Sequence, residues 1–138
     1  MKQMPMVEKV MTAMPHTIGR KLPVKKALEL MRENRIRHLP VLEASDLVGI
    51  ITDRDIKLAS SFQGAGELTV EDVMTPEPFS VLPSASLDQV VDEMAEHKYG
   101  CAIVRQSNGK VVGIFTAVDG FRFLSTIMKE HYKQIAKG

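Results

Sequence analysis

The chain of 138 residues is 44% hydrophobic and 25% charged, which is the balance of an ordinary soluble globular protein with one core. A formal net charge of +1 excludes a strong bulk attraction to nucleic acid or to an anionic membrane surface. One cysteine excludes an internal disulfide, and the lack of tryptophan argues against a base-stacking platform for single-stranded nucleic acid.

The first half of the chain predicts alternating helices and strands. An amphipathic helix is predicted by apolar residues at helical spacing, Val24, Ala27, Leu28 and Met31. Two short apolar runs then predict a hairpin of buried strands. In chain order the expected elements are a short helix (7–11), a proline-bounded extended segment (16–18), the amphipathic helix, strands at 39–42 and 47–51, and a helix from Asp53 to about Phe62.

The second half repeats this order. The segment VEDVMT at residues 70–75 corresponds to VEKVMT at residues 7–12. Pro78 corresponds to Pro15, and the separation along the chain is the same for both pairs. The expected elements are a short helix (70–74), an extended segment (79–81), an amphipathic helix with Leu87, Val90, Val91 and Met94, strands at 101–104 and 111–115, and a helix from Ala117 onward. A duplicated β-α-β-β-α unit explains the pattern.

The predicted fold class is α/β (α+β), with two repeats packed sheet to sheet around a pseudo-two-fold axis. Each repeat of roughly sixty residues has a marginal core alone, so the two are expected to form one module. The predicted boundaries are a first repeat at 7–62, a linker at 63–69 in the Gly- and Ser-rich stretch that begins at Ser60, a second repeat at 70–128 and a polar tail at 129–138.

In each unit the second strand of the hairpin ends in the pattern G-h-x-T-x-x-D, in which h is an apolar residue. The pattern occurs at residues 49–55 and 113–119. In one interpretation Thr52 and Thr116 cap the following helices, the aspartates complete capping boxes, and nothing else need be bound. In the other, a helix N-terminus at the end of a strand binds an anion, with Thr on a phosphate and Asp on ribose hydroxyls. A single T-x-x-D favours capping, whereas its recurrence in matching context favours a binding site.

The layout resembles a tandem pair of CBS domains, the unit named for cystathionine β-synthase and called a Bateman module when paired. The resemblance rests on V-x-x-V-M-T opening each unit, on RHLPV at residues 37–41 entering a strand, and on G-h-x-T-x-x-D in both units. It covers the chain from about Val7 to about Leu124. Each motif is weak alone, but two ordered sets are specific.

The resemblance implies a regulatory binding module, not an enzyme, with two pseudo-symmetric sites in a cleft between the sheets. Such modules bind adenosine-containing ligands, so AMP, ADP or ATP is expected here, with S-adenosylmethionine as the alternative and no other cofactor. The family's Asp holds ribose hydroxyls and its Thr reaches phosphate, roles that carry over to Asp55, Asp119, Thr52 and Thr116. The base lies against backbone and apolar groups, which carries over to Thr17, Ile18, Leu39, Pro40, Ser80, Val81, Ala102 and Ile103.

The two sites are predicted to be unequal. Near the cleft the first unit offers four basic side chains, Arg35, Arg37, His38 and Arg54, and Arg binds phosphate bidentately. The matching positions of the second unit hold Lys98, Gly100, Cys101 and Val118. We therefore predict that residues of the first unit bind most of the phosphate; for His38 a simple packing role is the alternative.

The sequence supports three candidate functions for the chain. The first is a stand-alone CBS pair, cytoplasmic and homodimeric, that senses an adenine nucleotide and signals to a protein partner. The second is a structural or protein-interaction module whose T-x-x-D motifs only cap helices, and the third is an RNA-binding module with steep salt dependence. Because no catalytic, zinc, signal-peptide or membrane-span pattern stands out, we expect neither an enzyme nor a metal or membrane protein.

Overall fold

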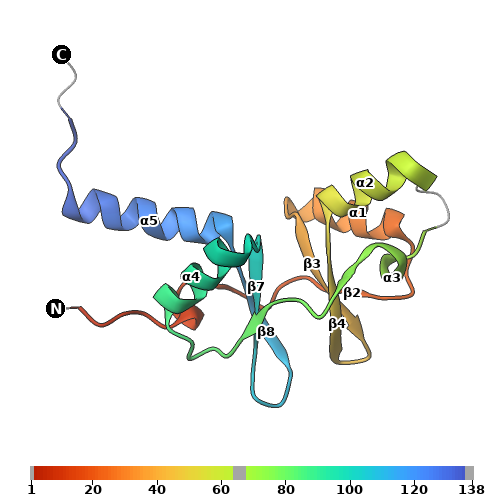
Figure 1. Cartoon of the computed structure of the whole chain (residues 1–138), viewed down its shortest axis with the longest axis horizontal. Coiled ribbons are helices and arrows are strands. Elements are labelled where there is room, and N and C mark those ends of the chain that lie inside the picture. Colours follow the sequence, from red (N-terminus) through yellow and green to blue (C-terminus); the bar gives the residue numbers. More distant parts are fainter. Residues whose placement is uncertain (1, 64–67, 136–138) are drawn as a thin grey trace.

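The computed structural model describes residues 2–63 and 68–135, which form two units that lie side by side (Figure 1). The first unit contains β2 (Ile18–Gly19), α1 (Val24–Asn34), β3 (His38–Glu43), β4 (Asp46–Thr52) and α2 (Asp53–Gln63). The second contains β6 (Ser80–Val81), α4 (Leu87–His97), β7 (Cys101–Arg105), β8 (Val111–Thr116) and α5 (Ala117–His131). The predicted β-α-β-β-α order is therefore confirmed in both units.

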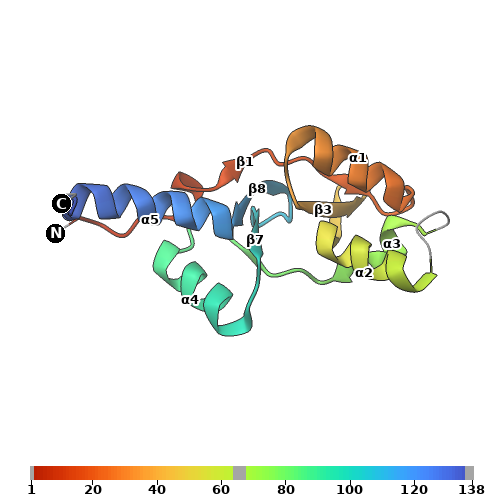
Figure 2. The ribbon, with the colours of Figure 1, turned by 90° about the horizontal axis from the view of Figure 1, so that it is seen from above.

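The segments that open the two repeats are exchanged between the units. The first, with the 3-10 helix η1 (Val7–Lys9) and β1 (Thr12–Ala13), places β1 antiparallel to β8 of the second unit. The second, with α3 (Val70–Val73) and β5 (Thr75–Pro76), places β5 antiparallel to β4 of the first unit. In Figures 1 and 2 the red N-terminal segment accordingly lies with the second unit and the green α3 with the first. The sheet orders are β1-β8-β7-β6 and β2-β3-β4-β5.

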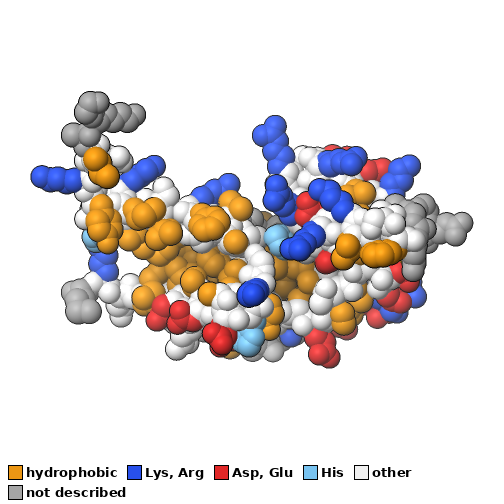
Figure 3. All heavy atoms as spheres, turned by 45° about the horizontal axis from the view of Figure 1, so that its top comes forward, with side chains coloured by type: hydrophobic (Ala, Val, Ile, Leu, Met, Phe, Trp, Pro, Cys, Tyr) orange, Lys and Arg blue, Asp and Glu red, His pale blue; other side chains and the backbone are white. Residues whose placement is uncertain are grey.

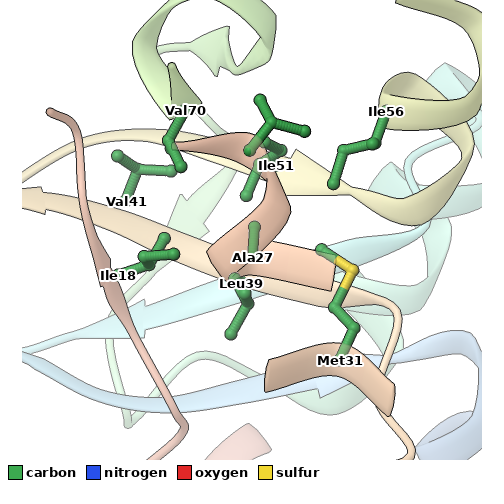
Figure 4. Close-up of a cluster of buried hydrophobic side chains, with 9 residues drawn as sticks. Ile18, Ala27, Met31, Leu39, Val41, Ile51, Ile56 and Val70 are labelled. Carbon is green, nitrogen blue, oxygen red and sulfur yellow. The ribbon is translucent and has the colours of Figure 1, made fainter. Parts of the chain in front are cut away.

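Buried side chains follow the same exchange. Val70 of α3 is fully buried in the apolar cluster of the first unit, beside α1, β3 and β4 (Figure 4). Val7 of η1 is fully buried in the cluster of the second unit, which contains Phe115. Arg20, just after β2, adds an ion pair with Glu71 of α3. Each opening segment thus completes the core of the opposite unit.

A methionine from each opening segment lies against the glycine of the opposite G-h-x-T-x-x-D motif. A Cβ atom added at Gly49 would lie 2.5 Å from the sulfur of Met74, and one added at Gly113 would lie 2.2 Å from the sulfur of Met11. Because real Cβ contacts are longer than this, both positions require glycine as packed. The methionine of each V-M-T motif therefore packs against the glycine of the G-h-x-T-x-x-D motif in the opposite unit.

The two sheets pack against each other through a third apolar cluster. It contains Ile50 of β4 together with Cys101, Ile103 and Ile114 of β7 and β8. Alternate residues of the same strands face the helices instead, as the two-residue period of a strand requires. Loss of water raises the pKa of the buried Cys101 thiol to about 12. The predicted sheet-to-sheet packing is confirmed.

The structure differs from the sequence-based expectations at several element ends. Ser60 and Ser61, assigned to the Gly- and Ser-rich stretch, lie in α2, where their hydroxyls donate to the carbonyl oxygens of Ile56 and Leu58. α2 ends at Gln63, and residues 64–67 of that stretch lie outside the described residues. The start of the predicted polar tail is helical, since α5 reaches His131. The two-residue strands β1 and β5 were not predicted because they are too short to show a period.

Candidate functional site

Both T-x-x-D motifs lie where a central strand ends and a helix begins, at the first junction (residues 52–55) and the second junction (residues 116–119). At the first, the N–H of Asp53 donates to the carbonyl oxygen of Arg37 at 3.2 Å. At the second, the N–H of Ala117 donates to the carbonyl oxygen of Gly100 at 3.1 Å. In both units these bonds fix the start of the helix to the start of the neighbouring strand.

The first junction forms only half of a capping box. Thr52 Oγ1 accepts a hydrogen bond from the N–H of Asp55 at 3.1 Å. Within the described residues the Asp55 carboxylate accepts no hydrogen bond and forms no ion pair, and its side chain is partly exposed. Arg37 and Arg54 are both exposed; Arg54 precedes Asp55 in the chain, and the carbonyl oxygen of Arg37 accepts from Asp53. This junction therefore presents a free carboxylate, exposed cations and a helix N-terminus, which suit ribose hydroxyls and phosphate.

The second junction forms the complete box. Asp119 Oδ2 accepts from the N–H of Thr116 at 2.9 Å, and Thr116 Oγ1 accepts from the N–H of Asp119 at 3.3 Å. The hydroxyl of Thr12, from β1, lies 3.3 and 3.4 Å from the two Asp119 oxygens. Asp119 is the one buried charged residue in the described part of the chain, with 9% of its surface exposed. The capping box predicted for this motif is thus confirmed.

His38 connects the two units at the starts of β3 and β7. A Cβ atom added at Gly100 would lie 3.0 Å from His38 Nε2, so glycine leaves room for the ring. A side chain at Gly100, the position matching Arg37, would therefore require the His38 ring to shift. Burial lowers the pKa of His38, and the charge of Arg37 lowers it further, against the opposing effect of Asp53 and Asp55.

The remaining predicted site residues divide by the face of the strand on which they lie. Ile18, Leu39 and Ala102 are core residues, so only their backbone atoms are available to a ligand. Ile103 faces the other sheet, as does Pro40 by the alternation of β3. Thr17 and Ser80 are half-buried at or next to β2 and β6, and Val81 packs against the second core.

Among the hollows that the described residues form on the surface, two differ in their relation to the site. One, of about 330 Å³, is lined by residues of the first opening segment and of α5, namely Val10, Met11, Thr12, Asp119, Arg122, Phe123 and Thr126. The other, of about 580 Å³, lies between α2 and α3 and contains no predicted site residue. Figure 3 shows Lys and Arg side chains gathered over the first unit, whereas the surface over α5 is mainly hydrophobic. The positive charge thus lies on the side of the first junction.

Sequence reasoning missed Thr12 and Gly100. Thr12 was visible only as the last residue of V-x-x-V-M-T, and Gly100 only as a departure from the first repeat. Residues 2–63 and 68–135 contain no group of three side chains suited to a metal ion. No helix in that part of the chain has the length and apolar character needed to cross a membrane.

Acidification is expected to destabilise the fold through His38. Its pKa is lower in the folded chain than the ordinary value near 6.5, so the unfolded chain takes up the proton first. The stability that the neutral ring provides is present above about pH 6.5 and is lost as the pH falls through the lowered folded pKa. Urea midpoints between pH 7.5 and 5.5 should fall for the wild type and fall less for His38→Gln; parallel curves would contradict this role.

Known proteins resemble this chain in sequence along most of its length. A family model described as CBS domain matches residues 7–61 and 70–126. The chain is 35% identical over 115 residues to CBS domain-containing protein YhcV of Bacillus subtilis, covering 82% of this chain and 81% of that protein. It is 36% identical over 105 residues to inosine-5'-monophosphate dehydrogenase of Korarchaeum cryptofilum, covering 76% of this chain but only 21% of the dehydrogenase.

Two solved structures that resemble the chain contain adenosine compounds. CBSX2 in complex with AMP has a TM-score of 0.75 and 30% identity, with 88% of this chain and 97% of that chain covered. The CBS domain pair of protein MJ0100, in complex with 5'-methylthioadenosine and S-adenosyl-L-methionine, has a TM-score of 0.80 and 26% identity, with 87% and 99% covered.

Proposed function

The chain belongs to the CBS domain family and carries two copies of the domain, and from this premise we propose that it is a regulatory module, not an enzyme, that binds an adenosine-containing ligand at the first junction. The observation that carries the proposal is the Asp55 carboxylate, which has no hydrogen-bond or ion-pair partner among the described residues and lies in a helix start that includes exposed Arg54 and bonds the backbone of exposed Arg37. The AMP held by CBSX2 and the adenosine compounds held by MJ0100 support the ligand class.

The groups at the first junction suit the parts of an adenine nucleotide. The Asp55 carboxylate accepts from the ribose hydroxyls, and the positive end of the α2 helix dipole favours a phosphate. Arg54 and Arg37 add charge-assisted bonds, which favour AMP, ADP or ATP over the cationic S-adenosylmethionine. The neutral ring of His38 and the backbone beside Thr17 and Pro40 form the remaining walls.

Saturating ligand is expected to raise the melting temperature. A ligand at 100 times its dissociation constant stabilises the folded chain by about 2.7 kcal/mol, which corresponds to a shift of about 5–10 °C for a chain of this size. Isothermal titration with AMP, ADP, ATP, NAD and S-adenosylmethionine, with thermal unfolding in parallel, tests this. If none binds, the structural or protein-interaction alternative takes precedence; steeply salt-dependent RNA binding would instead support the nucleic-acid alternative.

The bound ligand would signal by changing how helices pack against a protein partner, which requires unequal affinity for two arrangements.

As part of this proposal the module forms a homodimer through α5. That helix carries an exposed apolar stripe, Val118, Phe121, Leu124 and Met128. A stripe of this kind at helical spacing favours burial against a second copy.

Replacing Phe121, which is 68% exposed, is expected to convert the dimer to a monomer without lowering its melting temperature at low concentration. The measurement is light scattering after gel filtration at micromolar concentration, on the wild type and Phe121→Ser. Phe62→Ser is the matched control, since Phe62 is an exposed phenylalanine on α2. A monomeric wild type would remove the dimer from the proposal.

A further inference from the structure

We infer that Thr12 keeps the second junction closed, so that each chain binds one adenosine-containing ligand, at Asp55, and gains a second site only when Thr12 releases Asp119. The inference rests on the function proposed above and adds to it the number of sites and the residue that sets it.

Protein donors already occupy the Asp119 carboxylate. Oδ2 accepts from the N–H of Thr116 at 2.9 Å and from its hydroxyl at 3.2 Å. The Thr12 hydroxyl lies 3.3 Å from Oδ1 and 3.4 Å from Oδ2, and Arg122 Nη1 lies 3.8 Å from Oδ1. Thr116 takes both acceptor positions of Oδ2, and the Thr12 hydroxyl takes one of the two on Oδ1, so a ribose can place two hydroxyls on this carboxylate only if the Thr12 hydroxyl leaves. The Thr12 hydroxyl, which comes from another segment of the chain, is the donor that can leave without opening the helix.

The first junction provides an internal comparison. Thr75 stands 63 residues after Thr12 and lies on β5 beside β4, the position that matches Thr12 on β1 beside β8. Among the described residues, however, no hydrogen bond joins Thr75 to Asp55. The position that matches Arg122 is Leu58, which has no charge to offer. The same fold thus leaves one carboxylate free and occupies the other.

A hollow lies beside the Asp119 carboxylate, although it is not lined by the predicted base contacts of the second unit, Ser80, Val81, Ala102 and Ile103. Thr12 and Asp119 line the hollow of about 330 Å³, a volume at the lower end of the range for ligand pockets. Val10 and Phe123 give it apolar wall. The Thr12 contacts are longer than the 2.5–3.0 Å of strong O–H···O bonds, so this hydroxyl is the hydrogen-bond donor to Asp119 that a ligand replaces most easily, and its removal frees Oδ1.

Titration calorimetry of the whole chain with AMP and with ATP tests the inference. Thr12→Val keeps the shape of the side chain and removes the hydroxyl, and Thr75→Val is the matched control on the other sheet. We expect one nucleotide per chain for the wild type and for Thr75→Val, and two for Thr12→Val. Two equal sites in the wild type, or a single site in Thr12→Val, would overturn the inference.

A measurement without ligand separates this inference from the proposed function. If neither nucleotide binds any variant, the proposed function fails. Thermal unfolding then tests whether protein donors stabilise the Asp119 carboxylate and not the Asp55 carboxylate. Asp119→Asn weakens hydrogen bonds from several donors, so its melting temperature is expected to be several degrees lower than that of the wild type. The melting temperature of Asp55→Asn is expected to equal that of the wild type. Equal melting of the two variants would overturn the closure of the second junction.

Discussion

Asp55→Glu is expected to lose affinity for AMP or ATP by roughly tenfold to 100-fold while its stability stays within about 0.5 kcal/mol of the wild type. The cap at this junction uses the backbone N–H of residue 55, which glutamate keeps, and the free carboxylate loses no protein partner. The negative charge in the first turn of α2 is also kept. The added methylene moves the carboxylate away from the ribose hydroxyls, so only binding suffers.

The control for this variant is Asp119→Glu. The same extension at the second junction displaces a carboxylate that accepts hydrogen bonds from Thr116 and Thr12, so it should lower the melting temperature where Asp55→Glu does not. Calorimetry and thermal unfolding of both variants are the measurements. If Asp55→Glu binds AMP as tightly as the wild type, Asp55 does not contact the ribose.

Gly49→Ala is expected to destabilise the fold by about 1–3 kcal/mol, because the added methyl group overpacks the contact between β4 and β5. Its Cβ would lie 2.5 Å from Met74 Sδ and 2.9 Å from the carbonyl oxygen of Thr75. The side chain of Met74 can rotate, but the carbonyl belongs to the backbone of β5, which pairs with β4. Relief therefore requires the strand to move.

Gly113→Ala is the matched variant in the second sheet. There the three close atoms all belong to the side chain of Met11, so the cost is expected to be smaller. Adding Met11→Ala should remove most of the overpacking at Gly113, whereas adding Met74→Ala should leave the carbonyl contact at Gly49. Urea unfolding of the single and double variants measures both; a Gly49→Ala cost no greater than that of Gly113→Ala would contradict the packing argument.

Much of the fold could be predicted from local patterns. The helices α1 and α4 were recognisable because apolar residues at helical spacing mark the face that each buries. The hairpins followed from short apolar runs separated by turns, and the repeat fixed the order of elements in both units. These features depend on residues close together in the sequence, which is why the sequence was sufficient.

The candidate site was only partly accessible in the same way. The sequence located both T-x-x-D motifs at helix starts, since a strand followed by a capping pattern is itself a local signal. It did not distinguish Asp55 from Asp119, because both motifs have the same capping pattern and part of the difference lies in Thr12, which is 107 residues away from Asp119 along the chain. It also gave no reason for Gly100, whose neighbour is His38 of the other unit.

By itself, then, the sequence determined the duplicated order of helices and strands, the apolar faces that pack, and the two junctions where a strand runs into a helix. Only the tertiary structure decided that the opening segments cross to the opposite units, that each methionine meets the opposite glycine, and that Asp119 is occupied while Asp55 is free. The physical reason is that periodicity and capping record interactions within a few residues, whereas these contacts arise when distant segments pack.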